Sequence, residues 1–327
     1  MTSTPRPATP RPAAPRHAAN PAADAPVTLS TEVAEARDAG AAVVALESTI
    51  LSHGLPAGRN LEVAARLEDT VRRAGAVPAT IAVLDGTPQV GLTAAQLERV
   101  CSADEELDKL SARDLGPTLA AGRSGATTVA STSVLAHAAG IGVFATGGLG
   151  GVHLPPPGAT TTWDVSADLG VLGRTPILVV CSGMKSILDI PATLEVLETG
   201  SVPVLGYGVD EFPAFYLRSS GLPVPHRVDS PGQVAGAMTA HRAFSSAGML
   251  LANPIPAEAE MDLELHDRLL AEGLAKVGEA AVSGADVTPV LLEHFHTASG
   301  GVSLDANEEL VVANAELASR VAVELAR

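Results

Sequence analysis

The chain has 327 residues, a net charge of −16 and an isoelectric point of about 4.9, which argues against nucleic acid as a ligand. It is 46% hydrophobic but only 2% aromatic, so the expected core consists mainly of Ala, Val, Leu and Ile. No apolar run approaches the roughly 18 residues of a membrane span. Two cysteines, Cys101 and Cys181, are too few for a disulfide framework or a metal knuckle. We therefore expect a cytoplasmic protein without nucleic-acid or membrane partners.

The N-terminal segment differs in composition from the rest of the chain. Residues 1–26 contain seven of the 24 prolines and otherwise mostly Ala, Thr and Arg. Such a segment buries too little apolar surface to fold, and its proline density is incompatible with the amphipathic helix of a transit peptide. We predict residues 1–27 as a disordered tail and residues 28–327 as a single domain.

Short β-rich runs alternate with Ala-, Leu- and Glu-rich segments from about residue 30 onward. Continuous apolar strands separated by helices predict a mostly parallel sheet that is covered by helices on both faces. The predicted strands are 42–46, 80–84, 142–146, 177–181, 202–206 and 249–252. The predicted helices are 61–74, 94–101, 133–139, 192–198, 231–244, 263–281 and 307–325. Asp85-Gly86, followed by residues 87–92, indicates a hairpin and so a small antiparallel element.

Ligands of such folds bind at the carboxyl ends of the strands. Polar residues follow four of the predicted strands, and we expect them to share one site. They occupy positions 47–49, 146–148, 185–186 and 208–212.

Lys185 is the most informative of these residues. Only three of the 21 basic residues are lysines, and Lys185 comes just after a strand that should be buried on both faces. A desolvated lysine can lose its proton and attack a carbonyl, which arginine cannot do. The alternatives are a lysine whose ammonium reaches the surface and a lysine that binds phosphate.

Two other strand ends carry candidate groups. Burial of Glu47 at its strand end would raise the pKa of its carboxyl and suit it to donate a proton, although it could also be a helix cap or a surface acid. Four glycines within residues 147–151 let backbone N–H groups approach an anion, with Thr146 and His153 as side-chain donors. The alternative for this stretch is a flexible turn, and its spacing fits neither the dinucleotide-binding motif nor the P-loop.

Three further segments contain candidate ligand-binding residues. Asp164 and Asp168 flank an apparent helix start, where Asp164 could cap the helix or the pair could serve a divalent metal and a substrate amide. Lys109 could bind phosphate or lie on a solvated face. Asn307, at the expected start of the final helix, could cap that helix or bind substrate.

Together these segments resemble the pseudouridine-5′-phosphate glycosidases, also called the indigoidine synthase A-like family, from about residue 30 to the C-terminus. Many long motifs in the order of the family are more specific than any single one. The motifs are residues 45–50 (ALESTI), 77–86 (VPATIAVLDG), 144–148 (FATGG), 164–169 (DVSADL), 185–191 (KSILDIP), 206–208 (GYG), 210–216 (DEFPAFY) and 252–256 (ANPIP).

The resemblance implies reversible cleavage of the C–C glycosidic bond of pseudouridine 5′-phosphate to uracil and ribose 5-phosphate, the activity also called pseudouridylate synthase. It further implies a three-layer α/β/α core, a bound Mn²⁺ and a homotrimer. Lys185 matches the nucleophile that forms a Schiff base with ring-opened ribose, Glu47 matches the proton donor, and Asp164 matches the metal ligand. The positions that match substrate contacts are Lys109, Val129, Ser166, Ala167, Asp168, Thr146, His153 and Asn307, with Asp168 a candidate for the uracil edge.

Other functions remain compatible with these residues. One is a different Schiff-base lyase or aldolase acting on a phosphosugar, and another is a non-catalytic phosphosugar-binding protein whose lysines bind phosphate. A role in a pigment pathway also remains open. The chain departs from the family in its Pro/Ala-rich tail and in a long Pro-rich loop at 154–159, which lies next to His153.

Overall fold

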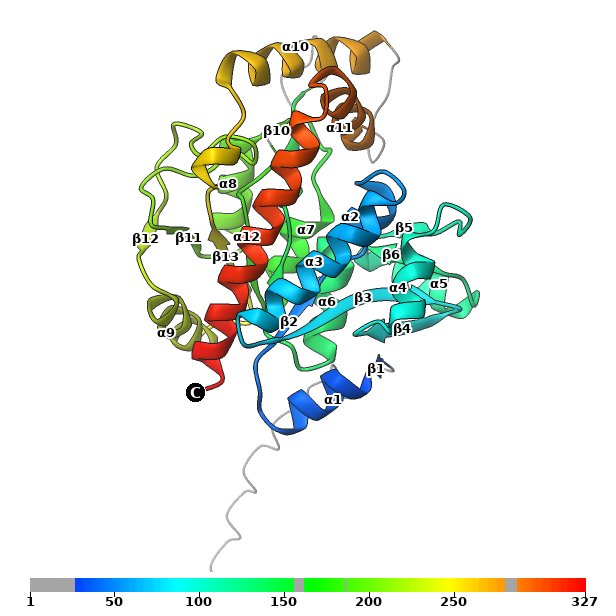
Figure 1. Ribbon diagram of the computed structural model, residues 1–327. Coiled ribbons are helices and arrows are strands. Elements are labelled where there is room, and N and C mark those ends of the chain that lie inside the picture. Colours follow the sequence, from blue (N-terminus) through cyan, green and yellow to red (C-terminus); the bar gives the residue numbers. More distant parts are fainter. Residues whose placement is uncertain (1–26, 156–161, 186, 280–286) are drawn as a thin grey trace, which may run out of the picture.

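A mostly parallel β-sheet forms the centre of the molecule (Figure 1). The computed structural model describes residues 27–155, 162–185, 187–279 and 287–327. In that part of the chain the sheet has eleven strands, and its central path is parallel from β3 to β12. The order across the path is β3 (Val77–Leu84), β2 (Val43–Leu46), β7 (Val143–Ala145), β9 (Leu178–Cys181), β13 (Met249–Ala252), β11 (Val204–Tyr207) and β12 (His226–Val228).

The central strands are buried because their side chains are apolar on both faces. All four residues of β9 have 0% exposure, and β13 is buried along its whole length. Uninterrupted apolar strands fit a sheet that has helices on each side, since neither face meets water. The core therefore consists mainly of aliphatic side chains, as the composition predicts.

The predicted hairpin forms one edge of the sheet. β4 (Thr87–Val90) pairs antiparallel with β3, and the turn residues Asp85 and Gly86 have φ angles of 50° and 73°. Two successive positive φ angles match a hairpin turn whose twist suits the strands that it joins. The other strands here are β1 (Thr28–Leu29), parallel to β4, β6 (Gly125–Thr127), antiparallel to β3, and β5 (Asp108–Leu110), parallel to β6.

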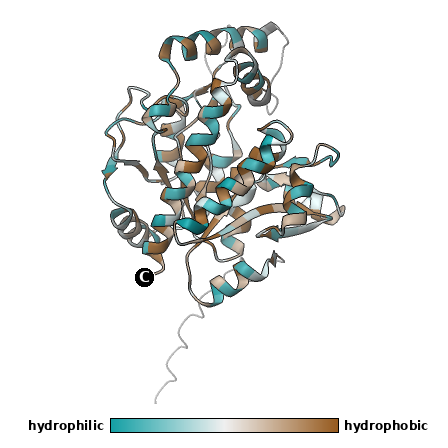
Figure 2. Cartoon of the chain, in the orientation of Figure 1, coloured by the Kyte–Doolittle hydropathy of each residue, from teal (hydrophilic) through white to brown (hydrophobic). Residues whose placement is uncertain are grey.

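Helices cover both faces and complete the predicted three-layer α/β/α fold (Figure 1). On one face α12 (Val302–Leu325) runs across β7 and β9 with α3 (Arg59–Arg73) and α9 (Pro231–Arg242) as its neighbours. The opposite layer contains α6 (Val129–Ala138), α7 (Ala167–Leu172) and α8 (Ile190–Thr199). In Figure 2 the sheet is largely apolar, while the outer surfaces of the helices carry the hydrophilic residues.

A pair of helices lies apart from these layers. α10 (Leu263–Glu279) and α11 (Val287–Ala298) pack against each other at the upper end of the molecule, where α11 also contacts α12 (Figure 1). The remaining elements are α1 (Thr31–Asp38), α2 (Thr49–His53), α4 (Ala94–Cys101), α5 (Leu115–Ala120), β8 (Val152–His153), β10 (Leu188–Asp189) and two 3-10 turns, Ala112–Asp114 and Ala257–Ala259.

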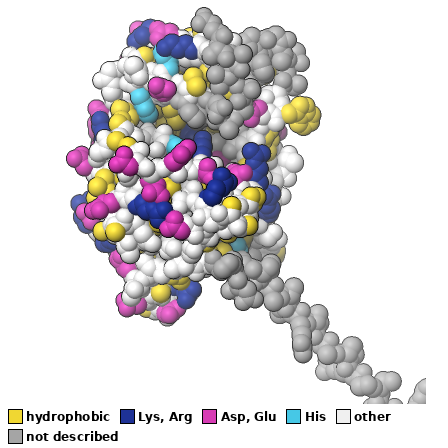
Figure 3. Space-filling model, turned by 90° about the vertical axis from the view of Figure 1, so that its right-hand side faces the viewer, with side chains coloured by type: hydrophobic (Ala, Val, Ile, Leu, Met, Phe, Trp, Pro, Cys, Tyr) yellow, Lys and Arg dark blue, Asp and Glu magenta, His cyan; other side chains and the backbone are white. Residues whose placement is uncertain are grey.

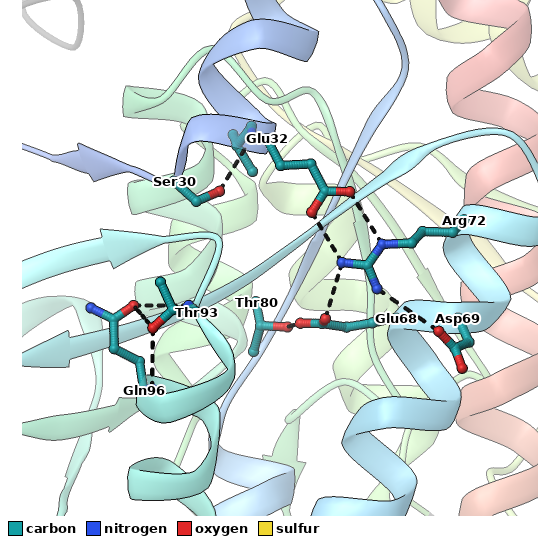
Figure 4. Close-up of polar contacts among 9 residues, drawn as sticks. Ser30, Glu32, Glu68, Asp69, Arg72, Thr80, Thr93 and Gln96 are labelled. Atoms are coloured by element: carbon teal, nitrogen blue, oxygen red, sulfur yellow. Dashed lines mark hydrogen bonds and ion pairs between the residues drawn. The ribbon is translucent and has the colours of Figure 1, made fainter.

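A charged cluster attaches α1 to the central layers (Figure 4). Arg72 of α3 donates to both carboxylate oxygens of Glu32 in α1, at 3.1 and 3.0 Å, and also to Glu68. Glu68 in turn accepts a hydrogen bond from Thr80 of β3. Burial raises the pKa of Glu68 in spite of these donors.

Every predicted strand and helix is present, with ends that move by a few residues. The largest shift matters for the site, because the final helix begins at Val302 and not at residue 307. Asn307 therefore lies in the second turn, and the helix cap is Gly301, so Asn307 does not cap this helix. Residues 1–26, most of the Pro-rich loop, Ser186 and the end of the helix predicted at 263–281 lie outside the described residues.

The surface carries both acidic and basic side chains, in agreement with the composition of the sequence (Figure 3). Acidic and basic side chains are interspersed over the face shown in Figure 3. Among the described residues, no helix combines the length and apolarity that crossing a bilayer requires.

Candidate active site

Three neighbouring parallel strands bring the predicted polar residues together. β2, β7 and β9 are adjacent in the sheet, and their carboxyl ends are followed by Glu47, Thr146 and Lys185. The Thr146 hydroxyl donates a hydrogen bond to the Glu47 carboxylate. The expected grouping at one edge of the sheet is therefore present for three of the four strand ends.

The fourth strand end, after β11, lies elsewhere. Asp210 is largely exposed and pairs with Arg227 at 2.8 Å, while Glu211 accepts a hydrogen bond from Ser219. Neither side chain lines the cavity described below. The expectation of one site shared by all four strand ends is wrong here, because β13 separates β11 from β9 in the sheet.

A cavity of about 540 Å³ lies beyond these strand ends. Its floor includes Glu47, Lys185 and the backbone of Gly147 and Gly148. Lys109 of β5 also lines it, as do residues of α2, α11 and α12. The volume is in the range of small-molecule sites.

Glu47 is in a protonation-prone environment. Burial raises the pKa of its carboxyl and outweighs the hydrogen bond from Thr146 and the charges of Lys185 and Lys109, which lower it. The nearby charge of Asp168 raises the Glu47 pKa further. A carboxyl that stays protonated toward neutral pH can act as a general acid.

Lys185 is held at the cavity by a tight turn. Gly183 has a φ angle of 77°, and a Cβ atom at this position would lie 2.0 Å from the carbonyl oxygen of Pro213. Only glycine fits there, so the turn after β9 has a fixed path. The half-buried Lys185 follows, and its carbonyl accepts from the Leu188 N–H at 3.0 Å.

The glycine loop after β7 is packed rather than flexible. Added Cβ atoms at Gly148 and Gly150 would lie 2.6 Å from the Phe215 ring and 2.5 Å from Ser166 Oγ. The N–H groups of Leu149 and Gly150 already donate, at 3.0 Å each, to the Gly183 carbonyl and to Asp168. The predicted approach of the loop backbone to an anion is thus restricted to Gly147 and Gly148, which line the cavity.

Asp168 ties this loop to the helix layer. Its two carboxylate oxygens accept from the backbone N–H groups of Ala130 at 2.9 Å and Gly150 at 3.0 Å, and its side chain is buried. Ser166 caps α7 by accepting from the Asp168 N–H, so Asp164 does not cap this helix. The candidates Val129, Ser166, Ala167 and Asp168 are outside the cavity lining.

His153 and Asp164 lie next to each other beside the glycine loop. His153 Nδ1 is 3.7 Å from Asp164 Oδ2, and the His153 N–H donates to the Asp164 carbonyl at 2.9 Å. Burial lowers the His153 pKa, the charge of Asp164 opposes this, and those of Lys185 and Lys109 lower it further. Across the described residues, no three His, Cys, Asp or Glu side chains gather as metal ligands would. Asp164 thus offers a single carboxylate to a cation.

Several residues of the site escaped the sequence analysis. Phe215 lines the cavity with a φ angle of 61°, a strained conformation for a bulky residue that is typical of functional sites. Asn314 of α12 is fully buried, donates to the Thr146 carbonyl at 2.8 Å and accepts from Asn253 at 3.0 Å. His296 also lines the cavity, together with Thr49 of the predicted polar group 47–49. No sequence motif surrounds His296 or Asn314, and the motif at 210–216 contains Phe215 without singling it out.

Comparisons with known proteins show the family to which the chain belongs. A family model for indigoidine synthase A-like proteins matches residues 32–324. The chain belongs to the indigoidine synthase A-like family. The resemblance drawn from the motifs is thereby confirmed.

Relatives within this family have names that state an activity. The pseudouridine-5′-phosphate glycosidase of Herpetosiphon aurantiacus is 53% identical over 298 residues, covering 91% of this chain and 97% of that protein. The pseudouridine-5′-phosphate glycosidase of Streptomyces griseus subsp. griseus is 53% identical over 300 residues, covering 91% and 92%.

Solved structures share the family fold. The prealnumycin C-glycosynthase AlnA, in complex with ribulose 5-phosphate, has a TM-score of 0.84 and 39% identity, covering 93% of this chain and 98% of AlnA. An indigoidine synthase A-like protein from Thermotoga maritima has a TM-score of 0.82 and 35% identity, covering 92% and 97%.

Proposed function

We infer that this protein is an enzyme that cleaves the C–C glycosidic bond of pseudouridine 5′-phosphate to give uracil and ribose 5-phosphate. One observation supports this most strongly: Lys185 and the protonation-prone Glu47 line one cavity, after two strands that are separated only by β7. The chain is also 53% identical to glycosidases that carry this name, along nearly their whole length. The phosphosugar in the AlnA complex is of the same ligand class.

The bond to be broken explains why a lysine is needed. A uracil carbon is a poor leaving group, so the ribose must supply an electron sink at C1′. We propose that Lys185 Nζ bonds to C1′ while the C1′–O4′ bond breaks and O4′ takes a proton, which opens the ring. The new ammonium loses a proton to become a secondary amine. Protonation of uracil C5 then accompanies cleavage of the C1′–C5 bond, as the amine lone pair forms an iminium at C1′. Water hydrolyses the iminium, releasing ribose 5-phosphate and the free lysine.

Glu47 is the proposed acid for ring opening. The elevated pKa of its buried carboxyl keeps it protonated where an ordinary glutamate would be ionised. After giving its proton to O4′, the carboxylate would be stabilised by Lys185, Lys109 and the Thr146 hydroxyl. The same group can assist the later proton transfers.

The other matched positions would hold the substrate. Lys109 brings positive charge to the cavity, and we propose it as a contact for the anionic end of the substrate, with Thr146 and His153 near the glycine loop. Asn307 lines the cavity directly. The hydrogen bonds of Asp168 support a role in holding the glycine loop in place, and substrate contacts of Val129, Ser166 and Ala167 stay predictions. A direct contact of Asp168 with the uracil edge stays a prediction.

Asp164 is the proposed ligand of a Mn²⁺ ion. Carboxylate oxygen suits a hard divalent cation, and one half-exposed carboxylate fits an ion that keeps most of its waters. Such an ion would supply positive charge that orients nearby groups.

We also propose a homotrimer in the cytoplasm. Trp163 is 97% exposed, and Val165 and Leu154 near it in sequence are partly exposed as well. Exposed apolar side chains of this kind are common in contacts between subunits. Light scattering should give three times the mass of one chain, and Trp163→Ser should reduce it.

The proposed function is tested by incubating the protein with pseudouridine 5′-phosphate and Mn²⁺ and measuring free uracil. We expect uracil and ribose 5-phosphate in equal amounts. A phosphosugar product without uracil would indicate a different lyase or aldolase, and binding without turnover would indicate a binding protein. Either result would contradict the proposal.

A further inference from the structure

Three residues that line the cavity each carry a buried polar atom without a hydrogen-bond partner among the described residues. These atoms are Thr49 Oγ1, His296 Nε2 and Asn307 Oδ1, which come from α2, α11 and α12. A buried polar atom that lacks a partner costs free energy, and native structures rarely retain one without a reason. Three such atoms around one cavity indicate that a ligand supplies the missing partners.

The cavity has two chemically different ends. Lys185, Lys109 and Glu47 line the cavity, and the charges of both lysines act on Glu47, so these three residues share its cationic end. Burial lowers the pKa of His296 and the charge of Glu293 raises it, whereas neither lysine contributes to its shift. Apolar side chains accompany it in the cavity wall, among them Leu292 and Ile50.

The substrate of the proposed function has two matching ends. Its phosphate and ribose carry the negative charge and the reacting C1′ atom, which suit the lysines. Uracil is flat and uncharged, and its edge alternates carbonyl acceptors with N–H donors. The α11 end of the cavity has polar atoms without a partner among the described residues, apolar walls and one carboxylate, Glu293, but no lysine, and it suits this uncharged base better than the phosphate.

We propose that His296 is a specificity-determining residue whose Nε2–H donates a hydrogen bond to a carbonyl oxygen of uracil. This inference rests on the proposed function and adds a residue to it. Burial lowers the His296 pKa, which favours the neutral ring with one N–H donor and one acceptor nitrogen. The Asn307 oxygen is an acceptor and complements a ring N–H of the same base.

The test measures inhibition of wild-type and variant enzyme by each product separately. In His296→Phe we expect the inhibition constant for uracil to rise about tenfold, the effect of one hydrogen bond with a desolvated partner. The constant for ribose 5-phosphate should change less than about twofold, because that product occupies the cationic end. His296→Gln keeps an N–H donor and should recover part of the uracil affinity.

His294→Gln is the matched control. His294 is on the same helix but interacts with α10, through a 2.9 Å hydrogen bond to Lys276. We expect it to leave both inhibition constants unchanged.

The outcomes separate this inference from the function on which it rests. Wild-type protein that releases no uracil would remove the proposed function and this inference with it. Active wild type with an unchanged uracil constant in both His296 variants would overturn the role of His296 alone. Equal rises for both products, or a rise in His294→Gln as well, would overturn it too, since they indicate displacement of α11. If His296→Phe does not fold, we expect His296→Gln to discriminate less between uracil and 4-thiouracil or 2-thiouracil, and unchanged discrimination would overturn the proposal.

Discussion

The floor and the roof of the cavity are built differently. The floor consists of the ends of β2, β7 and β9 and carries the ionisable groups Glu47 and Lys185. The roof comes from helices α2, α11 and α12 and carries, besides Glu293, neutral polar atoms such as His296 Nε2 that have no hydrogen-bond partner in the described part of the chain. Reactive groups thus lie on the rigid sheet, and groups suited to recognising a neutral base lie on the helices that close over it.

The supports of the two regions differ as well. Below the floor, Gly183 fixes the turn before Lys185, and Asp168 holds the glycine loop to α6. Asn314 joins α12 to the strand ends through side-chain hydrogen bonds. In the roof, α11 is held by its packing against α10 and α12. Changes in the floor should therefore affect the chemical step, and changes in α11 should affect binding.

Replacing Lys185 should have the largest effect. Lys185→Ala removes the amine that bonds to C1′, and we expect kcat for uracil release to fall on the order of 10³-fold or more. Lys185→Arg keeps the charge but cannot form an iminium, so it should be equally inactive. Substantial activity in Lys185→Arg would show that the residue acts only through its charge.

Glu47→Gln should lower kcat about 10²- to 10⁴-fold, as expected for loss of a general acid. Burial raises the Glu47 pKa, so the active protonated form is lost as pH rises through that pKa, and wild-type activity should fall there. The residual activity of Glu47→Gln should lack this alkaline decline. A pH profile of kcat/KM that keeps the same decline in the variant would assign it to another group.

The same shift predicts an opposite effect on stability. The Glu47 pKa is higher in the folded than in the unfolded state, so its contribution is complete below the ordinary carboxyl pKa and is lost as pH rises through the folded pKa. Above that pH the folded protein carries a buried carboxylate that Glu47→Gln lacks. Urea denaturation at pH 8 should show Glu47→Gln to be more stable than the wild type, with the difference shrinking toward pH 4.

Asn314→Ala should affect floor and roof together. It removes the side chain that connects α12 to Thr146, Ser182 and Asn253, and leaves buried groups without partners. We expect a loss of about 2–3 kcal/mol in the free energy of unfolding, together with lower kcat. Urea denaturation and steady-state kinetics would measure both. A variant with normal stability and activity would show that the two regions are independent.

The smallest effect is expected outside both regions. Arg66 and Glu309 form a 2.8 Å ion pair between α3 and α12, with side chains 41% and 42% exposed. Exposed pairs contribute little, so Arg66→Met should change the unfolding free energy by less than about 1 kcal/mol and leave kinetics unchanged. A larger loss would mean that the position of α12 depends on its outer surface.

The floor could be predicted from the sequence because short-range patterns determine it. Apolar runs such as 177–181 identify buried parallel strands, and polar residues just past them lie at one edge of the sheet. The pattern could not give the strand order, so it wrongly grouped the end of β11 with the others. It also left the glycine loop open between a flexible turn and an anion site.

The roof could not be predicted in the same way. His296 occupies an ordinary helix, and its importance depends on how α11 packs over the sheet. Asn314 is distinguished only by contacts with residues more than sixty positions away. The sequence predicts that the final helix begins at residue 307, five residues later than it does, and so it does not distinguish a capping from a ligand-binding role for Asn307.

The most direct test of the account is to trap the covalent intermediate on Lys185. Wild-type protein would be incubated with pseudouridine 5′-phosphate, reduced with borohydride, digested and analysed by mass spectrometry. We predict a reduced ribose 5-phosphate adduct on the peptide that contains Lys185, absent without substrate and absent in Lys185→Arg. Uracil release by an enzyme that yields no such adduct, or an adduct on another lysine, would contradict the assignment of Lys185 as the nucleophile.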